Sequence, residues 1–119
     1  MQHFTELNVW KRSHALVLEV YRLTKAFPAD ERFNLISQIR RAALSVPTNI
    51  AEGSKRRSQK EYARFLNYAE GSLSETEYLL MVSRDLGYLP GTTCGQHLKE
   101  ISEIARMLYA LRSRIEKLG

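Results

Sequence analysis

Apolar residues recur along this chain at intervals of three and four, the period of a helix with one buried face. No stretch alternates apolar and polar residues, and no Asn-Gly or Asp-Gly pair marks a hairpin. Turn-forming residues fall between the periodic stretches, because Pro28, Gly53 and the cluster Gly87, Pro90 and Gly91 divide the chain into four. The pattern predicts an all-α protein with four helices.

The first predicted helix runs from about Leu7 to Phe27 and stops before Pro28. Its apolar residues are too many to share one stripe: Leu16, Val17, Leu18, Val20, Tyr21 and Leu23. A helix that is apolar on more than one side is usually covered by more than one neighbour. We therefore expect this helix to make contacts beyond a single bundle.

The second predicted helix, from about Glu31 to Glu52, carries one continuous apolar stripe. Its members are spaced by 3, 4, 3 and 4 residues: Ile36, Ile39, Ala43, Val46 and Ile50. This spacing is typical of the seam along which bundle helices pack. Pro47 removes one main-chain hydrogen bond inside the helix, so we expect a kink or a short break there.

The third predicted helix begins at SQKE (Ser58 to Glu61), which has the form of a capping box. Its inward stripe is Tyr62, Phe65 or Leu66, Ala69, Leu73, Thr76 and Leu80. Gly87 can end this helix in a left-handed conformation.

The fourth predicted helix runs from about Thr93 to Leu118. Its stripe again follows intervals of three and four: Ile101, Ile104, Leu108, Leu111, Ile115 and Leu118. Because short connections make successive helices antiparallel, the sequence predicts an up-down antiparallel four-helix bundle, one domain over residues 1–119.

Composition narrows the class of protein. The lone Cys94 excludes an internal disulfide and fits a reducing compartment. The start MQHFTELNVWKRSH meets a charge within six residues, unlike a signal peptide. No apolar run approaches the ~20 residues of a membrane span. We expect a soluble, cytoplasmic protein.

The net charge of +5 is concentrated between Gln38 and Arg64. This segment holds two acidic residues, Glu52 and Glu61, and seven basic ones: Arg40, Arg41, Lys55, Arg56, Arg57, Lys60 and Arg64. The other 92 residues hold 11 basic and 11 acidic side chains. We interpret the basic residues as one cluster at a helix–turn–helix junction, where a local positive field attracts polyanions.

Two readings of this basic cluster stay open. A run of outward-facing charges is commonly just a solvated surface. However, cations at the start of the third helix meet the positive end of its dipole, and an anion there would relieve the repulsion and accept the free amides. Tyr62 and Phe65 fall on the predicted core stripe, so only Tyr68 is a candidate stacking platform for a base.

No pattern of catalytic or metal-binding residues is present. Cys94 and His97 form half of a zinc spacing with no second half, and no glutamate precedes a histidine by three residues. There is no Gly-rich phosphate loop and no G-x-S-x-G. We expect no enzyme activity, no metal and no cofactor.

Three segments carry a resemblance to a known family. They are LNVWKRSHALVLEVYRLTKAFP (7–28), SQIRRAALSVPTNIAEG (37–53) and RRSQKEYARFLNYAEGSLSETEYLL (56–80). Over nearly its whole length the chain resembles the 23S rRNA intervening-sequence proteins, small bacterial four-helix proteins. The middle segment is the most specific of the three, and the last helix matches only in pattern.

The resemblance implies a four-helix bundle that assembles into a ring, with five subunits expected. The family's name reflects genes that lie inside insertions in ribosomal RNA genes, and it implies no activity. A related branch is similar to the accessory protein of diversity-generating retroelements, a basic ring that partners a reverse transcriptase and engages nucleic acid. The resemblance supplies no catalytic residues, and it leaves the seven basic residues as candidate binding residues.

Two functions therefore compete. The first is a non-catalytic, oligomeric protein that binds RNA or DNA through backbone charge. The alternative is a ring-forming scaffold or adaptor that docks a partner protein such as a reverse transcriptase, with the basic surface steering association. An enzyme is a distant third.

Overall fold

The computed structural model describes residues 3–119, and within them it contains four long helices and no strand. The long helices are α1 (Asn8–Thr24), α2 (Ser37–Ser54), α3 (Gln59–Asp85) and α4 (Gly91–Leu118). Three short turns of other helix types precede α1 and α2: η1 (Phe4–Glu6), η2 (Ala29–Glu31) and η3 (Arg32–Ile36). The prediction of an all-α protein with four helices is confirmed.

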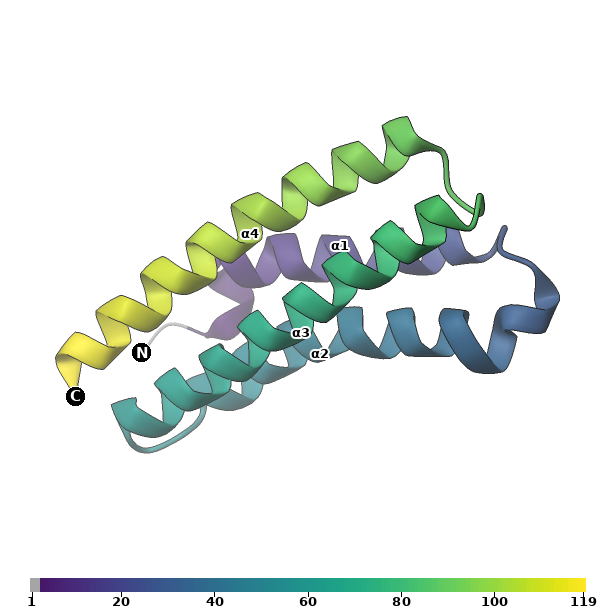
Figure 1. Ribbon diagram of the computed structural model, residues 1–119. Helices are drawn as coiled ribbons and strands as arrows, with labels where there is room; N and C mark the ends of the chain where they lie inside the picture. The colour runs from purple at the N-terminus through teal and green to yellow at the C-terminus, as the bar shows by residue number, and fades with distance from the viewer. Residues whose placement is uncertain (1–2) are drawn as a thin grey trace.

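Successive helices run in opposite directions along a body of 45 × 25 × 20 Å (Figure 1). The α2–α3 turn, the start of η1 and the C-terminus lie at one end of the bundle. The α1–α2 and α3–α4 connections lie at the other. Within residues 3–119, no helix is both long and apolar enough to cross a membrane.

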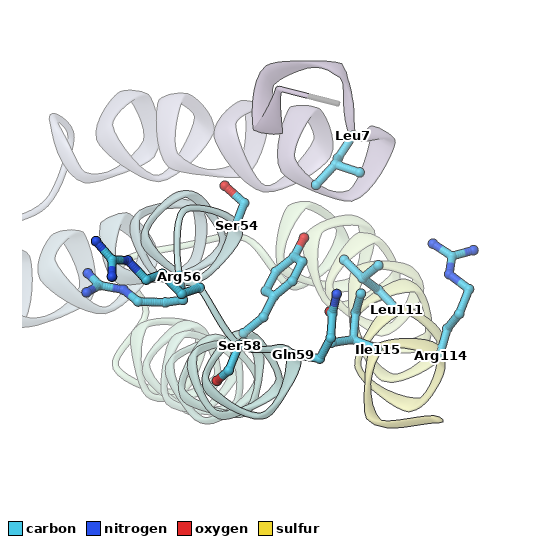
Figure 2. A pocket seen from close by; sticks show the side chains of 10 residues that line it. Leu7, Ser54, Arg56, Ser58, Gln59, Leu111, Arg114 and Ile115 are labelled. Atoms are coloured by element: carbon cyan, nitrogen blue, oxygen red, sulfur yellow. The ribbon is translucent and has the colours of Figure 1, made fainter. Parts of the chain in front are cut away.

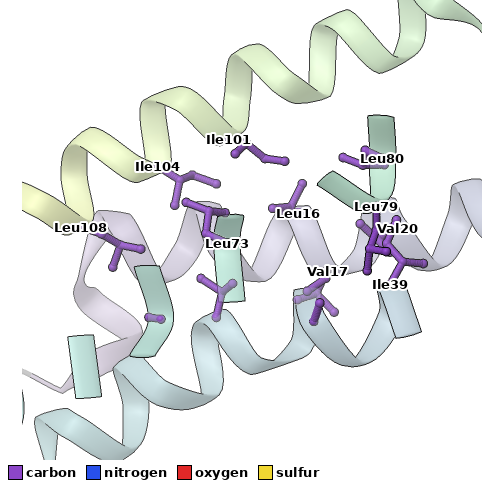
Figure 3. Close-up of a cluster of buried hydrophobic side chains, with 14 of the residues drawn as sticks. Leu16, Val17, Val20, Ile39, Leu73, Leu79, Leu80, Ile101, Ile104 and Leu108 are labelled. Carbon is purple, nitrogen blue, oxygen red and sulfur yellow. The ribbon is translucent and has the colours of Figure 1, made fainter. Parts of the chain in front are cut away.

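The core is built from the stripes that the sequence indicates (Figure 3). All five members of the α2 seam are buried, and so are the inward residues of α4 from Ile101 to Ile115. Of the two alternatives predicted on α3, Leu66 and not Phe65 occupies the core position. Leu118, the last member of the predicted α4 stripe, is 66% exposed, so it does not belong to the core.

Helix α1 has apolar residues on two sides, as expected. Leu16, Val17 and Val20 are buried against the other helices. Leu18, by contrast, is 58% exposed, and Tyr21 is also exposed. One apolar side of α1 therefore faces solvent in the isolated subunit.

The region around α2 settles one alternative and departs from the prediction at one place. Helix α2 continues through Pro47, which is buried, so of the expected kink or short break the break does not occur. Before α2, the predicted continuous helix is replaced by the 3-10 turn η2 and the π turn η3. The wider π turn places the adjacent residues Leu35 and Ile36 both in the core.

The predicted left-handed cap at the end of α3 is present, whereas only half of the capping box predicted at its start forms, because the Glu61 carboxylate pairs with Arg64. Ser58 Oγ accepts a hydrogen bond from the Glu61 amide at 3.0 Å. Gly87 has a φ of +82°, and the Tyr88 amide donates to the Ser83 carbonyl at 2.9 Å. These caps fix where α3 begins and ends, and hence where its charged first turn lies.

Candidate nucleic-acid interface

The turn between α2 and α3 is held tightly by Gly53. A Cβ at Gly53 would lie 2.7 Å from the Phe65 Cβ, so only glycine lets the last turn of α2 approach α3 this closely. The Lys55 amide donates to the Glu52 carbonyl at 3.2 Å, and the Arg56 amide donates to the Gly53 carbonyl at 3.0 Å. The backbone that carries the basic side chains is therefore fixed.

Five of the seven predicted residues gather around this turn, and we call them the junction cluster: Lys55, Arg56, Arg57, Lys60 and Arg64. All five side chains are exposed. Arg64 pairs with Glu61 at 2.8 Å. Within residues 3–119, no ion pair engages the other four.

Aromatic rings lie among these cations. The Arg56 guanidinium carbon is 4.9 Å from the centre of the Phe65 ring. The guanidinium of Arg64 lies about equally far from Phe65 and Tyr68, at 6.0 and 5.9 Å. Phe65 is half-buried rather than a core residue, so the prediction that it packs in the core is wrong. Tyr68 is exposed, as a stacking platform requires.

Arg40 and Arg41 lie elsewhere on α2. About 22 Å of helix separates Arg40 from Lys55, at 1.5 Å per residue. Arg40 packs over the Tyr21 ring at 4.6 Å and donates to Thr24 Oγ1 at 2.8 Å. Arg41 is exposed beside a polar pocket of about 510 Å³. The expectation of one cluster of seven at the junction is therefore wrong, because the structure brings together only five.

Arg114 is a further cation near the turn that the sequence pattern does not indicate. This exposed residue of α4 lines a pocket of about 240 Å³ beside the turn, with Arg56, Arg57 and Tyr62. Figure 2 shows the side chains of Arg56 and Arg114 extending outward on opposite sides of the pocket. Burial raises the pKa of Tyr62, and the positive charge of Arg114 opposes that shift. The predicted antiparallel order of the helices could have indicated Arg114, because it places the end of α4 beside the start of α3.

Some of the charges away from the junction are balanced by partners on other helices. Arg12 of α1 donates to Glu100 of α4 at 2.6 Å. Arg112 of α4 pairs with Glu70 of α3 and with Glu116 one turn along α4. The Arg12–Glu100 and Arg112–Glu70 pairs tie helices to one another.

The cysteine and histidine of the half zinc spacing contact the protein itself. Cys94 Sγ lies 3.6 Å from the Leu80 carbonyl, and burial raises the pKa of its thiol. His97 Nδ1 lies 2.8 Å from the Thr93 carbonyl, and Nε2 lies 3.3 Å from Glu19. Among residues 3–119, no three His, Cys, Asp or Glu side chains are arranged to hold a metal ion.

The fold recurs in a crystal structure from Bacteroides thetaiotaomicron, a protein of unknown function from the S23 ribosomal protein family. The TM-score is 0.78 at 22% sequence identity, covering 87% of this chain and 97% of that one. The comparison with curated proteins gives no match. The profile described as 23S rRNA-intervening sequence protein matches residues 5–110. Because this match spans most of the sequence, the chain belongs to the 23S rRNA-intervening sequence protein family.

Proposed function

We propose that this protein binds RNA or DNA without catalysis, through phosphate contacts at the junction cluster. The observation that carries the proposal is the set of four exposed cations there that have no ion-pair partner within residues 3–119. A surface that needed only solubility would not require such a concentration of charge. Phosphate contacts of this kind position a nucleic acid and do not read its sequence.

The local backbone also favours an anion. The start of α3 carries the positive end of the helix dipole, where each nearby cation costs about 0.3–1 kcal/mol before screening. Ser58 Oγ accepts a hydrogen bond from the Glu61 amide, but the other first amides of a helix have no partner inside the helix. A phosphate at this point can accept from those amides and offset the repulsion between the side chains.

Self-association is the second part of the proposal. Large apolar side chains are exposed on the subunit, including Leu18, and Phe33 is 89% exposed. Exposed apolar surface of this kind is covered in closed oligomers. A ring, with five subunits as the family resemblance implies, would repeat the junction cluster around one axis and strengthen binding through multivalency. Light scattering at micromolar concentration should give a mass near five subunits, and a 13.7 kDa monomer would refute this part.

The binding proposal is tested by the salt dependence of affinity. The slope of log affinity against log salt is roughly −0.9 per phosphate neutralised on duplex DNA and about −0.7 on single strands. The triple variant Arg56→Ala, Arg57→Ala, Lys60→Ala should flatten the slope by about two to three units per subunit in contact. It should weaken binding to all sequences alike.

A matched control removes three cations from the opposite end of the bundle. Lys25, Arg32 and Lys99 are exposed and have no ion-pair partner within residues 3–119. Their triple alanine variant has the same net charge as the junction variant, so any difference between the two reports location. Equal losses of affinity would show diffuse attraction and refute the junction as a site.

The adaptor function is the second candidate, and the exposed Phe33 favours it. Phe33 lies in η3, within the connection between α1 and α2. This connection lies at the end of the bundle away from the α2–α3 turn (Figure 1), so a partner protein could dock there without contact with the junction cluster. If the wild type binds no nucleic acid at low salt, docking of a partner protein becomes the better account.

A further inference from the structure

A short groove between the start of α1 and the second half of α2 has aromatic walls. We call it the aromatic groove; its volume is about 280 Å³. Its walls include Phe4, Trp10, His14, Leu44, Pro47 and Thr48. The function proposed above uses none of them.

The rings of the groove contact one another. Trp10 and His14 lie one helical turn apart on α1, with ring centres 5.1 Å apart and planes 5° from parallel, so the two rings are stacked. Phe4 meets Trp10 edge to face at 5.3 Å. Trp10 and Phe4 are half-buried, whereas His14 is exposed. The exposed His14 ring, stacked on Trp10, therefore offers a face against which a planar ligand can lie.

The groove is continuous with the junction cluster. The ammonium nitrogen of Lys55 lies 5.9 Å from the centre of the Phe4 ring, so a cation of the cluster stands at the rim of the groove. Glu52, exposed on α2, lines the same groove. A carboxylate repels phosphate, but it can accept a hydrogen bond from an N–H group of a base, such as N3–H of thymine. The groove thus offers an aromatic face, a nearby cation and one acceptor.

We propose that the aromatic groove stacks an unpaired base of a single-stranded nucleic acid whose phosphates lie on the junction cluster. This inference rests on the proposed function and adds the form of nucleic acid that is preferred. Bases of a duplex are already paired and stacked, whereas a single strand presents free faces to aromatic side chains. The cationic rim favours a base that arrives on a phosphate backbone over a second copy of this basic chain.

Trp10 is the only tryptophan of the chain, so its fluorescence reports on the groove directly. The probes are a ten-nucleotide oligothymidylate and an abasic oligomer of equal length and charge. Thymidylate should quench Trp10 and bind at least about fivefold more tightly, since stacking is worth ~1–3 kcal/mol per base. The abasic oligomer should still bind through phosphate but leave Trp10 fluorescence unchanged.

Two exposed aromatic residues provide matched variants. His14→Ala removes part of the stacking surface and should weaken thymidylate binding severalfold, with no effect on the abasic oligomer. Tyr78→Ala, on the exposed side of α3, should change neither affinity. Neither variant removes the fluorescent reporter.

Three other outcomes would overturn the inference. Equal affinity for both oligomers with unquenched Trp10 would overturn the stacking site and leave phosphate binding in place. No binding of either oligomer at low salt would overturn both proposals. A change in Trp10 fluorescence when the protein alone is diluted through subunit dissociation would show that a second copy covers the groove.

Discussion

Replacing Gly53 by alanine tests how firmly the turn that carries the junction cluster is held. The added methyl carbon would meet the Phe65 Cβ at 2.7 Å, Tyr62 Cδ1 at 3.1 Å and the Tyr62 carbonyl oxygen at 3.3 Å. The Phe65 Cβ is bonded directly to the backbone of α3, so a change of rotamer cannot relieve the clash. The end of α2 must move away from α3.

Two opposing terms set the size of the effect. Alanine is favoured over glycine within a helix by about 0.8–1.0 kcal/mol. Forcing an extra carbon into a close contact costs about 1–3 kcal/mol. The difference predicts a net destabilisation of about 1 kcal/mol, or a melting temperature lower by about 4 °C for a chain of this size.

Gly71→Ala is the matched control, because it makes the same chemical change in the middle of α3. A Cβ at Gly71 would meet no atom within 4 Å, so only the helix propensity changes and the melting temperature should rise by a few degrees. Thermal melts followed by circular dichroism should be compared at one subunit concentration, since association shifts them. A rise for Gly53→Ala equal to that for Gly71→Ala would refute the close-contact argument.

Two further changes probe the core and the surface charge. Val46→Asp should unfold or dissociate the protein, because an unpaired carboxylate at a fully buried site costs several kcal/mol, whereas the exposed Arg57→Ala should stay within ~0.5 kcal/mol of wild type. Equal urea midpoints for the Val46→Asp and Arg57→Ala variants would contradict the burial of Val46 on the apolar stripe of α2. A hydrogen bond from Arg22, with a second from His97, lowers the pKa of Glu19 to about 2. The ionised Glu19 carboxylate contributes fully to the free energy of unfolding above pH ~4.5, and this contribution is lost as the pH falls towards 2. Glu19→Gln should therefore make the free energy of unfolding depend less steeply on pH over that range. The difference should stay below ~1 kcal/mol, because the carboxylate is 42% exposed.

The helical core could be predicted because each buried stripe repeats the helical period. The α2 seam from Ile36 to Ile50 needs no knowledge of the partner helix, since spacings of three and four residues define one face. Periodicity fails where two adjacent residues lie at the edge of a stripe. Phe65 and Leu66 are 100° apart on α3, and only the positions of the neighbouring helices decide which one is buried.

The sequence predicts only the part of the candidate site whose residues are close together along the chain. The junction cluster follows from the residues between Lys55 and Arg64, but Arg40 is close in sequence and distant along a rigid helix. Arg114 and Trp10 come from helices whose positions next to the turn depend on tertiary packing. The distribution of charge along the sequence does not show that Arg114 and Trp10 lie near the turn.

The junction cluster works against the stability of the fold that carries it. Unit charges 6–10 Å apart in water repel by roughly 0.4–0.7 kcal/mol. The five cations of the junction cluster lie between Lys55 and Arg64, around the start of α3. The structure opposes this repulsion locally, through the Gly53 contact, the packing of Arg56 on Phe65 and the Arg64–Glu61 pair. A turn that could relax would separate its cations, whereas these contacts hold the backbone that carries them. Mutually repelling cations on a held backbone would gain from a polyanion, because phosphate would remove the repulsion without any need to reorganise the backbone.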